Sequence, residues 1–192
     1  MGTIVVFENV TLDGVTQDPT AEEGFTTDNW ITALPPADRE AWAKMVLDDA
    51  LGAQALLLGR GGYEYFGSRY PSRTSALADV MNRLPKYVVS TTLTDPEWHN
   101  STVIDLAEVS ALRQRIDGEL RVYASSRLVR TLIKQDLVDE LRLAVFPLLM
   151  GAGDRLLDQT GAPLPVRPWP LRLVDSRTVG DSIVHLTYRR DL

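Results

Sequence analysis

The segment from Leu120 to Asp154 constrains the fold most, because it joins a strand, a tight turn, a helix and a second strand in one run. Apolar and polar residues alternate through the first strand, and the helix places Leu128 and Leu132 on one stripe. The turn consists of three small residues, Ala124, Ser125 and Ser126. A helix that starts after such a turn can present backbone N–H groups to a phosphate. This segment predicts a phosphate or pyrophosphate site; the alternative is an ordinary capped helix.

Charge and composition limit the classes of function. The chain has 192 residues, 44% hydrophobic and 24% charged, which is typical of one soluble domain spanning 1–192. A net charge of −6 disfavours a nucleic-acid-binding face, although Arg127 and Arg130 provide local positive charge. No stretch approaches the roughly 20 apolar residues that cross a bilayer. We therefore expect a cytoplasmic protein that binds neither nucleic acid nor membrane.

Metal and thiol chemistry are not expected. The chain has no cysteine, which excludes disulfides and thiolate ligands. The two histidines, His99 and His185, are far apart and form no ligand pair.

The first third of the chain reads as strand, long loop, helix and strand. A β-rich run over Ile4–Val10 ends in the turn Thr11–Gly14. A polar loop over Gln17–Pro36 precedes a helix from Asp38 to about Leu51. The apolar run Ala55–Gly59 is typical of a strand buried on both faces.

The rest of the chain first continues the alternation of helices and strands and then predicts three strands in succession. Helices and strands are predicted in the order Ala76–Leu84, Tyr87–Ser90, Leu106–Ile116 and Glu119–Ala124. This repeated β-α-β pattern favours a mainly parallel sheet. Strands over Leu141–Val145, Leu171–Val179 and Ser182–Arg189 follow, and Gly180-Asp181 predicts an antiparallel hairpin between the last two. The segment 151–170, rich in Pro and Gly, is interpreted as an excursion of the same domain.

Several segments resemble, in order, one known family. They are Thr11-Leu12-Asp13-Gly14, Leu57-Leu58-Gly59-Arg60, Lys86-Tyr87-Val88-Val89-Ser90 and, most specifically, Leu128 to Gly153. The chain resembles the C-terminal reductase domain of the bifunctional riboflavin-biosynthesis deaminase-reductase, within the dihydrofolate-reductase-like superfamily. The deaminase half is not present in the sequence. The resemblance implies a mixed, mainly parallel α/β sheet with helices on both faces and a C-terminal antiparallel hairpin.

The resemblance also implies an activity, namely hydride transfer from NADPH to a small heterocycle, as in 5-amino-6-(5-phosphoribosylamino)uracil reductase. NADPH would lie across the carboxyl ends of the strands. The implied cofactor-binding residues are Gly59, Arg60, Gly61, Ser90, Thr91, Ala124, Ser125, Ser126, Arg127 and Leu128.

The implied substrate site lies on the first turn and the long loop. Asn9 and Trp30 are expected beside the substrate, and Asp13 and Asp38 are the expected catalytic residues. Each carboxylate also has a structural interpretation, because aspartate is common in turns and as a helix cap.

The chain departs from the family pattern at five positions. Gly61-Gly62 stands where a bulky residue and threonine are common, Thr91 replaces an arginine, and Ala124 and Ser126 replace glycines. These changes favour one alternative to the riboflavin-type reductase, a catalytically silent nucleotide- or flavin-binding protein. A further alternative is a dihydrofolate-type pterin reductase that uses Asp38, because the order Trp30, Asp38 and Trp42 also resembles the loop and helix of dihydrofolate reductases. We also expect a homodimer, with Leu141–Leu149 as a contact at a sheet edge.

Overall fold

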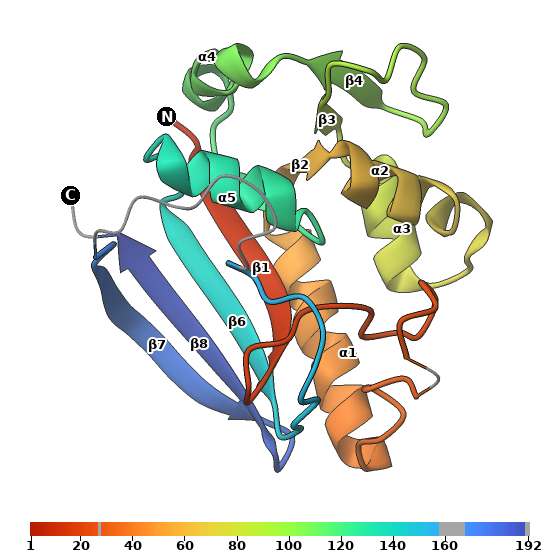
Figure 1. Cartoon of the computed structure of the whole chain (residues 1–192). Helices are drawn as coiled ribbons and strands as arrows, with labels where there is room; N and C mark the ends of the chain where they lie inside the picture. The colour runs from red at the N-terminus through yellow and green to blue at the C-terminus, as the bar shows by residue number, and fades with distance from the viewer. Residues whose placement is uncertain (27, 158–167, 191–192) are drawn as a thin grey trace. The chain divides into compact units, whose positions relative to one another are not determined.

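One eight-stranded sheet organises the protein, and a computed structural model describes residues 1–26, 28–157 and 168–190 (Figure 1). The strand order is β4-β3-β2-β5-β1-β6-β8-β7. The strands are β1 (Thr3–Thr11), β2 (Ala53–Gly59), β3 (Lys86–Val89), β4 (Ser101–Ile104), β5 (Glu119–Val122), β6 (Glu140–Phe146), β7 (Leu171–Val179) and β8 (Ile183–Arg190). The α-helices in this part of the chain are α1 (Pro36–Leu51), α2 (Arg60–Gly67), α3 (Ala76–Arg83), α4 (Val109–Arg115) and α5 (Ser126–Lys134). None of these helices is long and apolar enough to cross a membrane.

The chain divides into two compact units that share β1. The first unit comprises Met1–Val6 and Val46–Glu140. Its strands β4, β3, β2, β5 and the start of β1 pair in parallel, as the sequence predicts. Three consecutive leucines of β2, Leu56 to Leu58, have no exposed surface, which confirms a strand buried on both faces. Because β3, β2 and β5 are parallel, their carboxyl ends lie at one edge of this unit.

One α-helix and one strand of the first unit were not predicted. Helix α2 starts directly after β2, and Gly61 and Gly62 lie in its first turn. Strand β4 is short and lies at the sheet edge, where a strand needs little apolar patterning. Strand β5 ends at Val122, two residues earlier than expected.

The second unit comprises Phe7–Met45 and Leu141–Leu192, within which residues 27, 158–167 and 191–192 lie outside the described part. The predicted antiparallel hairpin is confirmed, because β7 pairs with β8 around a turn at Gly180. Strand β6 lies between β1 and β8. The expectation that Leu141–Leu149 offers a free sheet edge is therefore wrong for β6. Most of the predicted excursion over 151–170 belongs to residues 158–167, which are not described.

Candidate functional site: a pocket at the ends of three parallel strands

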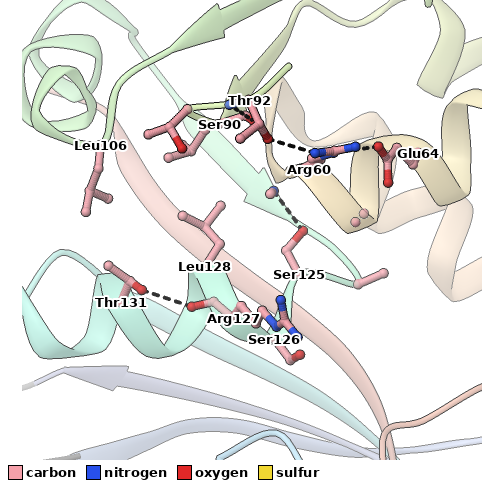
Figure 2. Close-up of a pocket in the computed structure, with 16 residues that line it drawn as sticks. Arg60, Glu64, Ser90, Thr92, Leu106, Ser125, Ser126, Arg127, Leu128 and Thr131 are labelled. Carbon is pink, nitrogen blue, oxygen red and sulfur yellow. Dashed lines mark hydrogen bonds and ion pairs between the residues drawn. The ribbon is translucent and has the colours of Figure 1, made fainter. Parts of the chain in front are cut away.

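A pocket of about 780 Å³ opens in the first unit where β2, β3 and β5 end (Figure 2). Its lining comes from Gly59–Gly62 with Glu64, from Val89–Thr92 with Leu106, and from Ala124–Leu128 with Thr131. All ten residues expected to bind the cofactor lie in this lining. Parallel strands bring their carboxyl ends to one edge, which explains why segments distant in sequence meet here.

Two helices, α2 and α5, begin at the pocket without a side-chain cap. The N-cap residue of α2 is Gly59, and that of α5 is Ser125; neither makes a capping hydrogen bond to its own helix. Neither helix has an acidic residue in its first turn. By contrast, the Ser75 hydroxyl accepts the Ala78 N–H at the start of α3. The first-turn N–H groups of α2 and α5 are thus available to an anion, which the helix dipole also favours.

The Ser125 side chain connects the segment that follows β5 to the end of β2 in the pocket lining. Its Oγ accepts the N–H of Gly59 at 3.1 Å, and the side chain is buried (Figure 2). This bond ties the start of α5 to the end of β2. The residue before it, Ala124, has a φ of +44°, a left-handed conformation that is unfavourable for a residue with a Cβ.

Arg60 supplies a guanidinium that is held from two sides (Figure 2). Its Nε donates to Glu64 Oε1 at 2.6 Å, and its Nη1 donates to Thr92 Oγ1 at 2.8 Å. Ser90 in turn accepts the backbone N–H groups of Thr92 and Leu93, which shapes the exit of β3. A second guanidinium, that of Arg127, is exposed at the start of α5. Two arginines against one glutamate leave the pocket lining with positive charge.

The expected catalytic residue Asp13 belongs to the second unit and stabilises a turn. Its carboxylate accepts the Thr11 hydroxyl at 2.6 Å and the Gly151 N–H at 2.7 Å, together with the Met150 N–H. The Thr11 hydrogen bond is the main cause that lowers its pKa to about 2. An ionised carboxylate with these partners has a structural role in the fold.

Asp38 also stabilises a turn and is not a helix cap. It is the third residue of α1 and is almost fully buried. One oxygen accepts the Ser182 hydroxyl and the other accepts the Asp181 N–H, in the turn between β7 and β8. The Ser182 hydrogen bond is the main cause that lowers the pKa of Asp38. A carboxylate that is ionised and occupied in this way is poorly suited to donate a proton.

The two expected substrate residues lie among aromatic side chains of the second unit. Asn9 Oδ1 accepts the indole N–H of Trp42 at 3.0 Å. Trp30 is buried and its ring makes a T-shaped contact with Phe146, with 6.1 Å between the ring centroids. The Trp30 N–H is buried and has no acceptor among the described residues. None of Asn9, Asp13, Trp30 and Asp38 lines the pocket of the first unit.

Glu8 is a residue that sequence reasoning missed. It lies in β1, is only 8% exposed, and its Oε1 has no hydrogen-bond partner in the described part of the chain. Burial raises its pKa to about 8. The available signal was a glutamate inside the otherwise apolar strand Ile4–Val10. At neutral pH this side chain is mostly a neutral acid.

Comparisons with known proteins agree with this fold. A family model described as the RibD C-terminal domain matches residues 2–185. The uncharacterized protein YyaP of Bacillus subtilis is 26% identical over 140 residues, which cover 69% of this chain and 72% of YyaP.

The solved structures that share the fold include two that cover nearly the whole chain. A putative riboflavin biosynthesis protein from Shewanella sp. PV-4 has a TM-score of 0.73 at 21% identity and covers 99% of both chains. Dihydrofolate reductase from Enterococcus faecalis, complexed with NADP(H), has a TM-score of 0.60 at 16% identity and covers 99% of this chain and 97% of its own. The expected dihydrofolate-reductase-like α/β fold is confirmed.

Proposed function

Because this chain belongs to the RibD C-terminal domain family, we propose that it is a reductase that uses NADPH to reduce a small heterocycle. The proposed activity resembles that of 5-amino-6-(5-phosphoribosylamino)uracil reductase in riboflavin biosynthesis. The observation that carries the proposal is the pair of uncapped helix starts, α2 and α5, in one pocket with Arg60.

The chemistry of this pocket fits a dinucleotide. Free N–H groups at two helix starts suit the two phosphates of a pyrophosphate, and the guanidinium of Arg60 suits a further phosphate. When bound, NADPH would supply the hydride. The pocket residues would bind and orient it, and positioning of this kind provides much of the rate enhancement in reductases.

The described residues of the second unit include buried polar atoms without partners, which are the proposed candidates for binding a heterocycle. Glu8 Oε1 and the Trp30 N–H have no partners among the described residues. A buried polar group without a partner is unfavourable, so such groups are often completed by a ligand. A neutral carboxylic acid both donates and accepts hydrogen bonds, as the edge of a pyrimidine or pterin does.

The two alternatives differ in support. The dihydrofolate-type reading needs a free Asp38, and the Ser182 and Asp181 donors that occupy this carboxylate oppose it. The silent-binding reading draws on Ala124, whose side chain stands in the pocket lining with a positive φ. A measured oxidation of NADPH would distinguish the reductase from the silent-binding protein.

A titration tests the proposal first. Purified protein is titrated with NADPH and separately with NADH, while quenching of tryptophan emission is followed. We expect saturable NADPH binding in the micromolar range, and NADPH oxidation when the riboflavin-pathway pyrimidine or a pterin is added. Binding of neither dinucleotide would contradict the proposal. If NADPH binds but is not oxidised when any of the heterocycles is added, the silent-binding alternative would be favoured.

We also propose that the protein is a homodimer. A free sheet edge is a common site of pairing between copies, and β7 lies at an edge with most of its residues exposed. Sedimentation that shows a monomer at every concentration would contradict this proposal.

A further inference from the structure

A buried polar network ends at the turn that joins β5 to α5. The Tyr123 hydroxyl donates to Asp49 Oδ2 at 2.7 Å, and the Asp49 carboxylate is ion-paired with Arg121. Arg121 has no exposed surface and makes a second ion pair with Glu119. Asp49 belongs to the last turn of α1, where the helix dipole disfavours a carboxylate. The buried guanidinium offsets this cost, so the network fixes the Asp49 carboxylate beside Tyr123.

The Tyr123 side chain joins the turn to two helices. Its hydroxyl is bound to Asp49 of α1, and its ring makes a T-shaped contact with Phe66 of α2, with 6.4 Å between the ring centroids. The side chain is only 7% exposed. Tyr123 is therefore held in place at both its polar end and its apolar face.

Ala124 lies between two anchored residues. On one side Tyr123 is bound to Asp49, and on the other Ser125 Oγ accepts the Gly59 N–H (Figure 2). Ala124 itself has a φ of +44°, which is unfavourable for a residue with a Cβ. Such a conformation persists only where the surrounding structure holds it. The two anchors supply that constraint.

The turn also packs directly against the first turn of α2. A Cβ built on Gly62 would lie 2.5 Å from Ser125 Oγ and 3.0 Å from the carbonyl oxygen of Ala124. Carbon atoms of side chains do not approach other atoms this closely, so no side chain fits at position 62 beside this turn. A relaxed turn would therefore alter the pocket where both α2 and α5 begin.

We propose that Tyr123 is a positioning residue of the pocket: its hydroxyl, held by Asp49, keeps Ala124 in the left-handed conformation that places the start of α5 at the ligand. Tyr123 does not line the pocket and acts through Ala124. This inference deepens the proposed function and rests on it for the choice of NADPH as the probe.

Tyr123→Phe tests the hydroxyl alone. It leaves the Phe66 contact and the ion pair between Asp49 and Arg121 in place, so no buried charge loses its partner. The strain at Ala124 should then relax the turn. We expect NADPH to bind roughly 5- to 30-fold more weakly, the factor that corresponds to the strain of one left-handed residue. An NADPH affinity equal to that of the wild type would overturn the proposal.

Tyr63→Phe is the matched control. Tyr63 is also 7% exposed, and its hydroxyl accepts the Trp98 N–H at 2.9 Å, away from the turn. Tyr63→Phe should lower Tm but keep the NADPH affinity of the wild type. An equal loss of affinity in Tyr63→Phe and Tyr123→Phe would show a general effect of losing a buried hydroxyl and would overturn the positioning role.

A double variant separates positioning from a purely structural role. In Ala124→Gly the positive φ no longer carries strain, so loss of the Tyr123 anchor releases none. Adding Tyr123→Phe to Ala124→Gly should therefore weaken NADPH binding by no more than about 2-fold. The same factor in both backgrounds would mean that the hydroxyl does not act through Ala124, and the proposal would fail.

NMR of the free protein tests the anchor without a ligand. The backbone carbon shifts of Ala124 report whether this residue is left-handed. They should move away from left-handed values in Tyr123→Phe and stay unchanged in Tyr63→Phe. If the wild type binds no NADPH, the proposed function fails, and this measurement still decides the inference: unchanged Ala124 shifts in Tyr123→Phe would overturn it.

Discussion

In the first unit, the starts of α2 and α5 keep their backbone N–H groups free, whereas in the second unit Asp13 and Asp38 are occupied by donors from distant turns. Both sets of groups looked functional in the sequence. Geometry separates them, because a polar group with protein partners stabilises the fold and one without them can meet a ligand. The pocket is therefore the better functional candidate.

Glu8 does not fit this division, because it is an acidic residue of the second unit whose Oε1 has no partner among the described residues. If the comparison is right, Glu8 should behave unlike Asp13 and Asp38 in every test of stability. The predictions below test this difference, from the largest expected effect to the smallest.

Glu8→Gln should change the pH dependence of stability most. The folded pKa of about 8 exceeds the ordinary 4.5, so the folded protein keeps a proton that the unfolded chain releases. This contribution to stability is full below pH 4.5 and is lost as pH rises to about 8, a loss on the order of 4 kcal/mol. Urea unfolding at pH 5 and pH 8 should show this fall for the wild type, and much less of it for Glu8→Gln. Glu97→Gln, at an exposed glutamate, should keep the wild-type fall.

Gly180→Ala should destabilise the second unit by about 2 to 4 kcal/mol. The new Cβ would fall on the Asp38 carboxylate and lie 2.8 Å from Asp38 Cα, at a φ of +64°. Gly24→Ala is the matched control, because Gly24 has a φ of +83° with nothing within 4 Å of its Cβ. It should cost only the backbone strain of about 1 to 2 kcal/mol. Equal losses in urea unfolding would show that the turn does not depend on Asp38.

Asp38→Asn should reduce stability more than catalysis. The amide keeps one acceptor and loses the charge that the Ser182 and Asp181 donors stabilise. We expect Tm to fall by several degrees while kcat and NADPH affinity of the folded enzyme stay near wild type. An unchanged Tm with lost turnover would restore Asp38 as the catalytic residue and break the comparison.

The sequence predicted the pocket well because its signals are local. Apolar runs mark buried parallel strands, and the residues after β2, β3 and β5 must then meet at one edge. Helix α2 was not predicted; its first turn contains Gly61 and Gly62, and glycine is a poor helix former. The reason for Gly62 is Ser125, 63 positions later, and no local pattern contains it.

The roles of the carboxylates could not be predicted for a similar reason. The partners of Asp38 are 143 and 144 positions away, in a turn that looks ordinary by itself. An aspartate in a turn gives the same sequence pattern whether its carboxylate accepts hydrogen bonds from the protein or from a substrate. Burial of Glu8 likewise depends on the tertiary structure. A single glutamate in an apolar strand suggests such burial but does not establish it.

Ala124→Gly should change the free energy of unfolding least among these variants, and the direction of its effect on NADPH affinity is informative. Glycine removes the strain of a Cβ at φ +44° and adds backbone freedom to the unfolded chain, so the net change in stability is expected within about 1 kcal/mol. The same substitution at Ala111, an exposed residue of α4, should instead destabilise by about 1 kcal/mol, because helical φ suits alanine. The difference between the stability changes of the two variants measures the strain stored at Ala124.

NADPH affinity then decides what that strain is for. If the Ala124 side chain merely narrows the pocket, Ala124→Gly should bind NADPH more tightly than the wild type at similar stability. If the side chain instead holds Ser125 in place, the freed backbone should weaken binding although stability is unchanged. Tighter binding would mean that the wild-type turn limits NADPH affinity, as the silent-binding alternative requires. Weaker binding would mean that the turn is preorganised for a ligand, as the comparison of the two units predicts.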